Sequence, residues 1–288
     1  HQNFNSWDNS YDNQNSLRLD KLSLNWEHAG TKASIGRTEV KLGEGLIWWE
    51  NQVDGAYVKH QFGPKVTAML GVGDISAEGW HDSNINAQFG EIAVQTSPAT
   101  KIAVSNMRTL TDVQKYASGT NWVEVTTPGG TTWVPSGTWS KWEDDAYKLN
   151  QYSLSVNTQI APKWNVIAEA VTNNVGTVAN ANKHGVWTRV TYGKMDWKTA
   201  KDWQVYGEYF ALGNTSVDSS KWGHRLNIAG GDGFGGHGAR GFGINLDYMV
   251  ANNTCLGLNY YKLKPYDEAA AGFSKYDDIA TVALSYMF

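Results

Sequence analysis

Residues 151–160 read QYSLSVNTQI, and their apolar and polar residues alternate almost without a break. Tyr152, Leu154, Val156 and Ile160 share one side of the pattern, while the residues between them carry mainly amides and hydroxyls. Successive side chains of a β-strand point to opposite faces, so this pattern predicts a strand with one apolar and one polar face. An amphipathic helix would instead repeat its apolar residues every three or four positions.

The same alternation recurs along the chain, whereas no stretch sustains the helical repeat between capping residues. We therefore expect an all-β protein whose strands are about ten residues long, the length that a tilted strand needs to cross a bilayer. The thirteen predicted strands are residues 16–27, 31–41, 54–62, 65–74, 85–96, 101–110, 147–160, 163–173, 185–195, 202–213, 239–251, 254–265 and 276–288.

The links between the predicted strands are short and long in turn. The short links are residues 27–30, 63–64, 97–100, 161–162 and 251–254, with 195–202 somewhat longer. The long links are residues 42–53, 75–83, 111–145, 174–184, 214–238 and 267–275. Tight turns at one end and long loops at the other are typical of an antiparallel up-and-down β-barrel that spans a bacterial outer membrane.

Such barrels normally have an even number of strands, which leaves one strand unaccounted for. If the last strand ends in the periplasm, the missing strand either precedes His1 or lies within residues 1–13. We favour the first, because residues 1–14 are rich in Asn, Asp and Ser and are typical of an outer loop. The long link 111–145 offers one further hairpin at residues 121–135, NWVEVTTPGGTTWVP. The complete barrel, with residues 1–288 as a single domain, would then have 14 strands, or 16 with this hairpin, around a water-filled lumen.

The composition fits a membrane barrel and disfavours several other classes. The 288 residues include 14 Trp and 14 Tyr, and no run of 18 apolar residues could form a membrane-spanning helix. The mean hydropathy of −0.46 is compatible with spanning strands, because only every second residue of such a strand meets lipid. A net charge of −4 gives no sign of a nucleic-acid partner, and the single Cys255 has no partner for a disulfide.

Aromatic residues gather near the ends of the predicted strands. Those near the short links are Trp26, Phe62, Trp164, Trp197, Trp203 and Phe288, and those near the long links are Trp48, Trp49, Trp80 and Trp142. Amphipathic rings at both boundaries form the girdles that hold a barrel at its depth in the bilayer. A soluble β-sandwich is the alternative, but the other face carries too many charges for a dry interior.

The polar face supplies the candidate pore-lining residues. By alternation these are Lys21, Lys59, Lys65, Glu91, Lys101, Glu169, Arg189, Glu208 and Asp247. The alternation slips near Arg37 and Arg108, and we expect both to face the lumen, because a charge facing lipid at mid-bilayer costs about 2–4 kcal/mol. Mixed signs on the wall predict weak ion selectivity, and the slightly acidic total argues against a dedicated anion pore.

The longest link, 111–145, ends in a charge cluster of Lys141, Glu143, Asp144 and Asp145. Two interpretations of this cluster remain open. The loop either folds into the lumen as a constriction or lies in solvent outside the barrel.

No motif indicates catalysis, a cofactor or a metal site. Residues 230–238, GGDGFGGHG, contain a formal G-x-G-x-x-G, but an alternating strand follows where the dinucleotide fingerprint needs a helix. No G-x-S-x-G nucleophile motif is present, and the histidines lack ligand spacing. We therefore expect no enzyme activity, no cofactor and no metal.

Two segments resemble bacterial outer-membrane porins. The terminal ALSYMF, residues 283–288, is similar to their C-terminal aromatic signature. Residues 33–63, ASIGRTEVKLGEGLIWWENQVDGAYVKHQFG, are similar to their G-R strand, loop and DGAYV return strand. The chain is most similar to the barrel of the OmpM-type major porins of diderm Firmicutes, whose S-layer-homology domain has no counterpart in these residues. The resemblance implies a homotrimer in outer-membrane lipid, and recognition of Tyr286 and Phe288 by the barrel assembly machinery.

These observations predict an outer-membrane porin, a passive diffusion channel for small hydrophilic solutes and ions. One alternative is a soluble all-β protein that binds or hydrolyses carbohydrate through exposed tryptophans, and another is a barrel enzyme, for which no constellation is found at the rim. A substrate-specific sugar channel is a variant of the main hypothesis. Its aromatic ladder would consist of Tyr57, Trp187, Tyr206 and Tyr261.

Overall fold

The computed structural model describes residues 22–75, 85–110, 113–127, 130–147, 149–174, 182–217, 225–226 and 237–287, with the backbone alone for residues 51, 113–127 and 130–147. The strands are β1 (Leu22–His28), β2 (Thr31–Leu42), β3 (Trp48–Phe62), β4 (Val66–Asp74), β5 (Asn86–Ser97), β6 (Thr100–Thr109), β7 (Val113–Thr127), β8 (Gly130–Tyr147), β9 (Asn150–Ala161), β10 (Trp164–Asn173), β11 (His184–Lys194), β12 (Trp203–Leu212), β13 (Ala239–Ala251), β14 (Thr254–Lys264) and β15 (Ile279–Tyr286). A short helix, α1 (Glu268–Ala271), follows β14. Within the described ranges, no helix is long and apolar enough to span a membrane.

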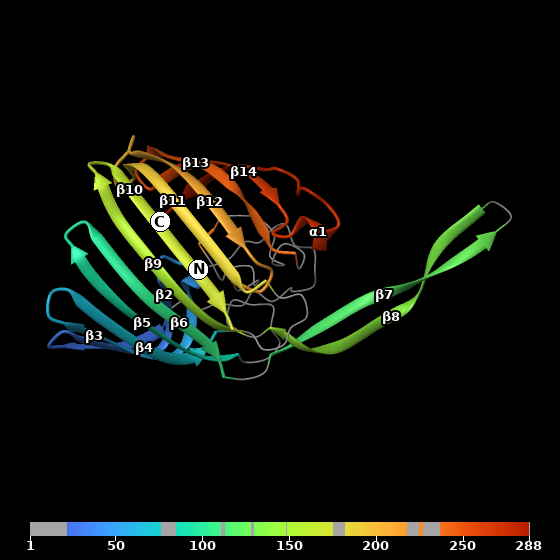
Figure 1. Ribbon diagram of the computed structural model, residues 1–288, viewed down its shortest axis with the longest axis horizontal. Coiled ribbons are helices and arrows are strands. Elements are labelled where there is room, and N and C mark those ends of the chain that lie inside the picture. Colours follow the sequence, from blue (N-terminus) through green and yellow to red (C-terminus); the bar gives the residue numbers. More distant parts are fainter. Residues whose placement is uncertain are drawn as a thin grey trace.

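Thirteen of the strands form one antiparallel sheet, in the order β1-β2-β3-β4-β5-β6-β9-β10-β11-β12-β13-β14-β15. Each strand pairs with the one before it in the chain, except that β9 pairs with β6, so the topology is up-and-down. Figure 1 shows the sheet curving around an interior. The predicted all-β class, the thirteen strands and the alternation of tight turns with longer links are confirmed.

One face of the sheet is apolar and exposed. In the pairing of β14 with β15, Leu256 lies opposite Leu284 and Leu258 lies opposite Val282, so these four side chains share a face. Val282 is 75% exposed and Leu284 is 70% exposed. Apolar side chains on the other strands continue this outer surface, among them Leu24, Ile35, Val58, Leu70, Ile92, Val104, Leu154, Val190 and Ile244. Lipid covers such a surface in a membrane-spanning strand, whereas a soluble protein rarely exposes one so large.

The opposite face lines the interior of the curve. A buried cluster joins Leu42 and Leu46 to Phe89 on β5 and Phe210 on β12. β5 and β12 are separated in the sheet by β6, β9, β10 and β11, so their side chains can meet one cluster only across the concave side. This side is the inner face of the sheet.

Residues 43–47, which connect β2 to β3, fold onto this inner face and are here called the inner link. The connection is shorter than the predicted link 42–53, because both strands run further than expected. Gly45 has a φ of 106°, in the left-handed region that favours glycine. A Cβ atom at Gly45 would lie 2.5 Å from the Trp49 ring, so a side chain there would displace the inner link.

β7 and β8 form the hairpin predicted within link 111–145, and the hairpin is longer than residues 121–135. The two strands pair only with each other, and Figure 1 shows them extending away from the sheet. β6 pairs directly with β9, so the hairpin adds no strand to the wall, and the predicted total of 16 strands is wrong for this structure. The expected strand before His1 and the outer loop 1–14 lie outside the described residues.

Candidate functional site

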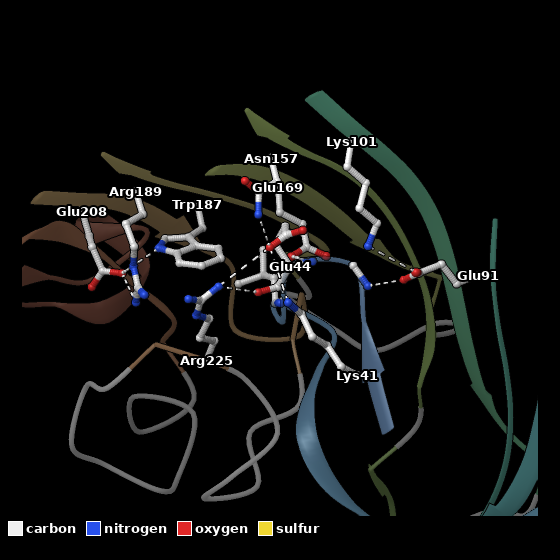
Figure 2. A network of polar contacts seen from close by, with 12 residues as sticks. Lys41, Glu44, Glu91, Lys101, Asn157, Glu169, Trp187, Arg189, Glu208 and Arg225 are labelled. Carbon is white, nitrogen blue, oxygen red and sulfur yellow. Dashed lines mark hydrogen bonds and ion pairs between the residues drawn. The ribbon is translucent and has the colours of Figure 1, made fainter. Parts of the chain in front are cut away.

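Two carboxylates on the inner face hold the inner link against the sheet (Figure 2). Glu169 of β10 accepts hydrogen bonds through Oε2 from the N–H groups of Glu44, at 3.1 Å, and Leu46, at 2.9 Å. Glu91 of β5 accepts one through Oε2 from the N–H of Gly43, at 2.6 Å. β5 and β10 are separated by β6 and β9, so the inner link is tied to two distant parts of the wall.

Glu44 lies at the centre of this arrangement and is buried. Its Oε2 accepts a hydrogen bond from Asn157 Nδ2 at 3.0 Å and forms ion pairs with Lys41 Nζ at 3.5 Å and Arg225 Nη1 at 3.8 Å. A buried carboxylate needs partners of this kind, because removal of one member of a buried ion pair costs about 3–5 kcal/mol. The side chain therefore anchors the inner link as well as placing a charge on it.

Arg225 reaches the same place from the long link between β12 and β13. Its backbone N–H donates to the carbonyl oxygen of Gly45 at 2.8 Å, and its guanidinium lies 4.3 Å from the centre of the Trp49 ring. Burial lowers the pKa of Arg225 to about 10, and the carboxylate of Glu44 opposes this shift. Segments from two different long links thus meet inside the sheet.

A second charged cluster is built on β11, β12 and β14. Glu208 Oε1 accepts hydrogen bonds from Arg189 Nε at 2.6 Å and from Trp187 Nε1 at 3.1 Å. Its other oxygen, Oε2, accepts one from the Tyr261 hydroxyl at 2.7 Å. The Arg225 guanidinium lies 5.7 Å from the Trp187 ring, so the two clusters form one polar network across the inner face, as Figure 2 shows.

The four aromatic residues predicted to face inward do so, but they offer no open ladder. Trp187 is 1% exposed and Tyr261 is 0% exposed, and Tyr206 is also buried. Tyr57 packs partly buried against the same apolar cluster. Rings that are covered in this way cannot stack on a passing sugar, so the structure gives no support to the sugar-channel variant.

Most of the predicted pore-lining residues lie on the inner face. They are Lys59, Lys65, Glu91, Lys101, Glu169, Arg189, Glu208 and Asp247. The structure brings several of them together: Lys101 lies 3.7 Å from Glu91, and Arg189 pairs with Glu208. Lys21 lies outside the described residues. That these side chains line a pore remains a prediction.

Arg37 and Arg108 lie on the outer face, so the prediction that they face the lumen is wrong. Arg37 lies opposite the exposed Leu22, and Arg108 lies four residues after the outward-facing Val104, which is an even separation and therefore the same face of the strand. The prediction rested on the cost of placing a charge against lipid. This cost is reduced for Arg37, because its Nε and Nη2 donate hydrogen bonds of 2.6 and 2.5 Å to the carboxylate of Asp54, which neutralises its charge.

The positions of these two arginines also keep them away from mid-bilayer. Asp54, the partner of Arg37, lies opposite Asp74, the last residue of β4. Arg108 lies next to Thr109, the last residue of β6. Both therefore lie level with the ends of neighbouring strands, where a charge facing outward costs much less than at the bilayer midplane.

Lys141, Glu143, Asp144 and Asp145, the candidate constriction residues, lie on β8, where only the backbone is described. The hairpin that carries them extends away from the sheet, and the structure does not bring them to the inner network (Figure 1). Of the two assembly-signal residues, Tyr286 is exposed at the end of β15, and Phe288 lies outside the described residues.

Sequence reasoning missed Lys41, Glu44 and Arg225. A signal for Glu44 exists in residues 42–47, LGEGLI, because glycines flank the acid and two large apolar residues follow. That composition is unusual for a solvated loop. Arg225 carries no comparable signal, since it is an isolated arginine in a long link.

Comparisons with known proteins yield structural neighbours only. No family model matches the chain, and no curated protein sequence matches it significantly. The outer membrane protein OpdK from Pseudomonas aeruginosa is similar over 92% of this chain and 78% of its own, with 12% identity and a TM-score of 0.41. OccD3 (OpdP) from Pseudomonas aeruginosa covers 93% and 77%, with 11% identity and a TM-score of 0.45. Wzi, a carbohydrate-binding outer-membrane β-barrel involved in capsule assembly in Escherichia coli, covers 91% and 68%, with 9% identity and a TM-score of 0.42.

Proposed function

We propose that this chain forms a transmembrane β-barrel in the outer membrane of a diderm bacterium and acts as a passive channel for small hydrophilic solutes and ions. The supporting observation is the division of a single up-and-down sheet into an exposed apolar face and an inner face that carries the charges. An apolar outer wall is stable in lipid, while charged side chains need water or a partner.

We assign the constriction of this channel to the inner link rather than to residues 141–145. The inner link crosses the interior and is tied to the wall by Glu91 and Glu169. Lys41, Glu44 and Arg225 place both signs of charge beside it. A path next to these residues would select solutes by size and only weakly by charge.

The assembly state is part of the same proposal and derives from the resemblance to OmpM-type porins. In this view three copies associate in the outer membrane, and the barrel assembly machinery recognises the C-terminal Tyr286 and Phe288. The exposed apolar face disfavours the alternative of a soluble carbohydrate-binding protein, because soluble proteins rarely expose so large an apolar surface to water.

Reconstitution in a planar lipid bilayer tests the proposal. The full chain, folded in detergent and showing the heat-modifiable gel migration of an intact barrel, is expected to give stepwise, ohmic conductance in potassium chloride. A folded preparation that inserts into lipid vesicles without producing any conductance steps would contradict the channel function.

A further inference from the structure

A cleft of about 440 Å³ opens on the inner face at the short-turn end of the sheet, and four lysines line it. They are Lys32, Lys59, Lys65 and Lys101, and Glu27 is the single acidic residue of this lining. We call this site the lysine cleft. It adjoins the inner network through Lys101, which lies 3.7 Å from Glu91, and extends from there toward the short turns.

The pairing of five neighbouring strands explains why the four ammonium groups share one cleft. Lys32 of β2 lies directly opposite Lys59 of β3, and Lys101 of β6 lies directly opposite Gln95 of β5. Lys65 lies in the turn before β4, where its carbonyl oxygen accepts a hydrogen bond from the Gln95 N–H at 2.7 Å. The strand register therefore concentrates positive charge at one end of the interior.

The charge of the lysine cleft is only partly compensated: Glu27 lies directly opposite Lys32 in the pairing of β1 with β2, but no ion pair joins them. Lys101 lies 3.7 Å from Glu91, but Lys32, Lys59 and Lys65 form no ion pair with any residue that the structure describes. Elsewhere on the inner face, Arg189 pairs with Glu208. Like charges directly opposite each other destabilise a pair of strands, and Lys32 lies directly opposite Lys59. A bound anion would remove this repulsion and so stabilise the pairing of β2 with β3.

We propose that the lysine cleft is a binding site for small anions that carry two or more negative charges, such as dicarboxylates, tricarboxylates or phosphate monoesters. Lysine ammonium groups act as point charges without the fork geometry of arginine, so they select charge rather than a particular shape. The volume lies within the range of small-molecule sites. Gln61, Gln95 and Thr67, which also line the cleft, supply neutral hydrogen-bonding groups.

This inference rests on the proposed channel function and deepens it. A multivalent anion in the lysine cleft would occupy the path of smaller ions, and the fixed positive charge would favour anions at this end of a chain whose net charge is −4. The mixed charges of the whole inner face predict weak ion selectivity. At the short-turn end, the lysine cleft would instead make the channel prefer anions.

The test measures chloride current through the reconstituted full chain while inorganic phosphate or citrate is added to one side of the bilayer and then to the other. We expect each anion to reduce the current at millimolar concentration, more effectively from one side. The variant Lys32→Gln/Lys59→Gln should raise the half-blocking concentration roughly tenfold, because two of the four point charges are removed. Its reversal potential in a potassium chloride gradient should shift toward cation preference.

The matched control is Lys198→Gln/Lys201→Gln, which removes the same charge from two exposed lysines in another short-turn link. Phosphate and citrate should block this control at the same half-blocking concentrations as the wild type. An equal shift in the control would show a net-charge effect and overturn the proposal, as would an unchanged half-blocking concentration in Lys32→Gln/Lys59→Gln. Block by phosphate alone would narrow the ligand to phosphate compounds, and block by citrate alone would narrow it to carboxylates.

Two further measurements keep the site testable whatever the channel does. Lys32→Arg/Lys59→Arg keeps the charge and should retain the block; if the glutamine variant fails to fold, Lys65→Gln in the turn takes its place. If the folded wild type carries no current, the channel proposal fails, and isothermal titration calorimetry with phosphate and citrate then decides the site alone. No binding heat in the wild type would overturn it.

Discussion

At the scale of single residues, the carboxyl groups of Glu91 and Glu169 act as hydrogen-bond acceptors for backbone N–H groups of the inner link. Glu169 is separated in sequence from Glu44 by 125 residues and from Leu46 by 123, yet one of its oxygens accepts both N–H groups. Both hydrogen bonds are buried, so neither N–H group could turn to water if this acceptor were lost. The position of the inner link therefore depends on a side chain that lies in a distant strand.

Replacing Glu169 with alanine should release the inner link. The change leaves the N–H groups of Glu44 and Leu46 without their acceptor, and an unsatisfied buried donor costs about 1–3 kcal/mol. We expect the free energy of unfolding to fall by at least that amount in a denaturant titration in lipid vesicles. The single-channel conductance should rise and become noisier, because the link no longer holds one position.

Two variants make this result specific. Glu169→Gln keeps one carbonyl oxygen as an acceptor and should lie between the wild type and the alanine variant. Asp277→Ala removes an exposed carboxylate from the link before β15 and should change neither quantity. An unchanged conductance in Glu169→Ala, together with reduced stability, would mean that the inner link does not narrow the path.

At the scale of elements, the strands and the lengths of the links could be predicted, but the inward path of residues 43–47 could not. A period of two residues is a local property, so QYSLSVNTQI already indicates β9 and its two faces. The inward fold of residues 43–47 depends on Glu91 and Glu169, whose positions relative to the link are set only when the sheet forms. The local sequence of a link therefore does not predict which link will lie beside such acceptors.

The hairpin of β7 and β8 can be removed without opening the wall, because β6 and β9 pair directly from Thr100 and Thr158 to Arg108 and Asn150. We expect replacement of residues 111–148 by a short glycine-containing turn to leave the heat-modifiable barrel and its single-channel conductance unchanged. A conductance that rises severalfold would show that the hairpin does narrow the path in the membrane. Truncating the hairpin only at residues 121–135 serves as the milder control.

At the scale of the whole molecule, alternation and link parity predict the architecture because every strand obeys the same two-faced rule. The exceptions are instructive. The alternation slips at Arg37 and Arg108, and there the assumption of a uniform lipid environment gave the wrong face. Asp54 opposite Arg37 supplies the compensating charge, and this pairing is visible only once the register of β2 and β3 is known.

Deletion of residues 286–288 tests whether the end of the chain serves assembly rather than conduction. Tyr286 lies opposite Thr254, and the N–H of Met287 donates to the carbonyl oxygen of Asn253 at 2.9 Å, so the deletion shortens one strand pairing only at its end. We expect the amount of heat-modifiable barrel in isolated outer membranes to fall severalfold. The same truncated chain, folded in detergent without the assembly machinery, should conduct like the wild type.

Deletion of three residues of α1, 269–271, is the matched control and should insert normally, because α1 lies in a link. Normal barrel levels after the terminal deletion would contradict the assembly role, and loss of folding in detergent would instead show that the terminal residues stabilise β15.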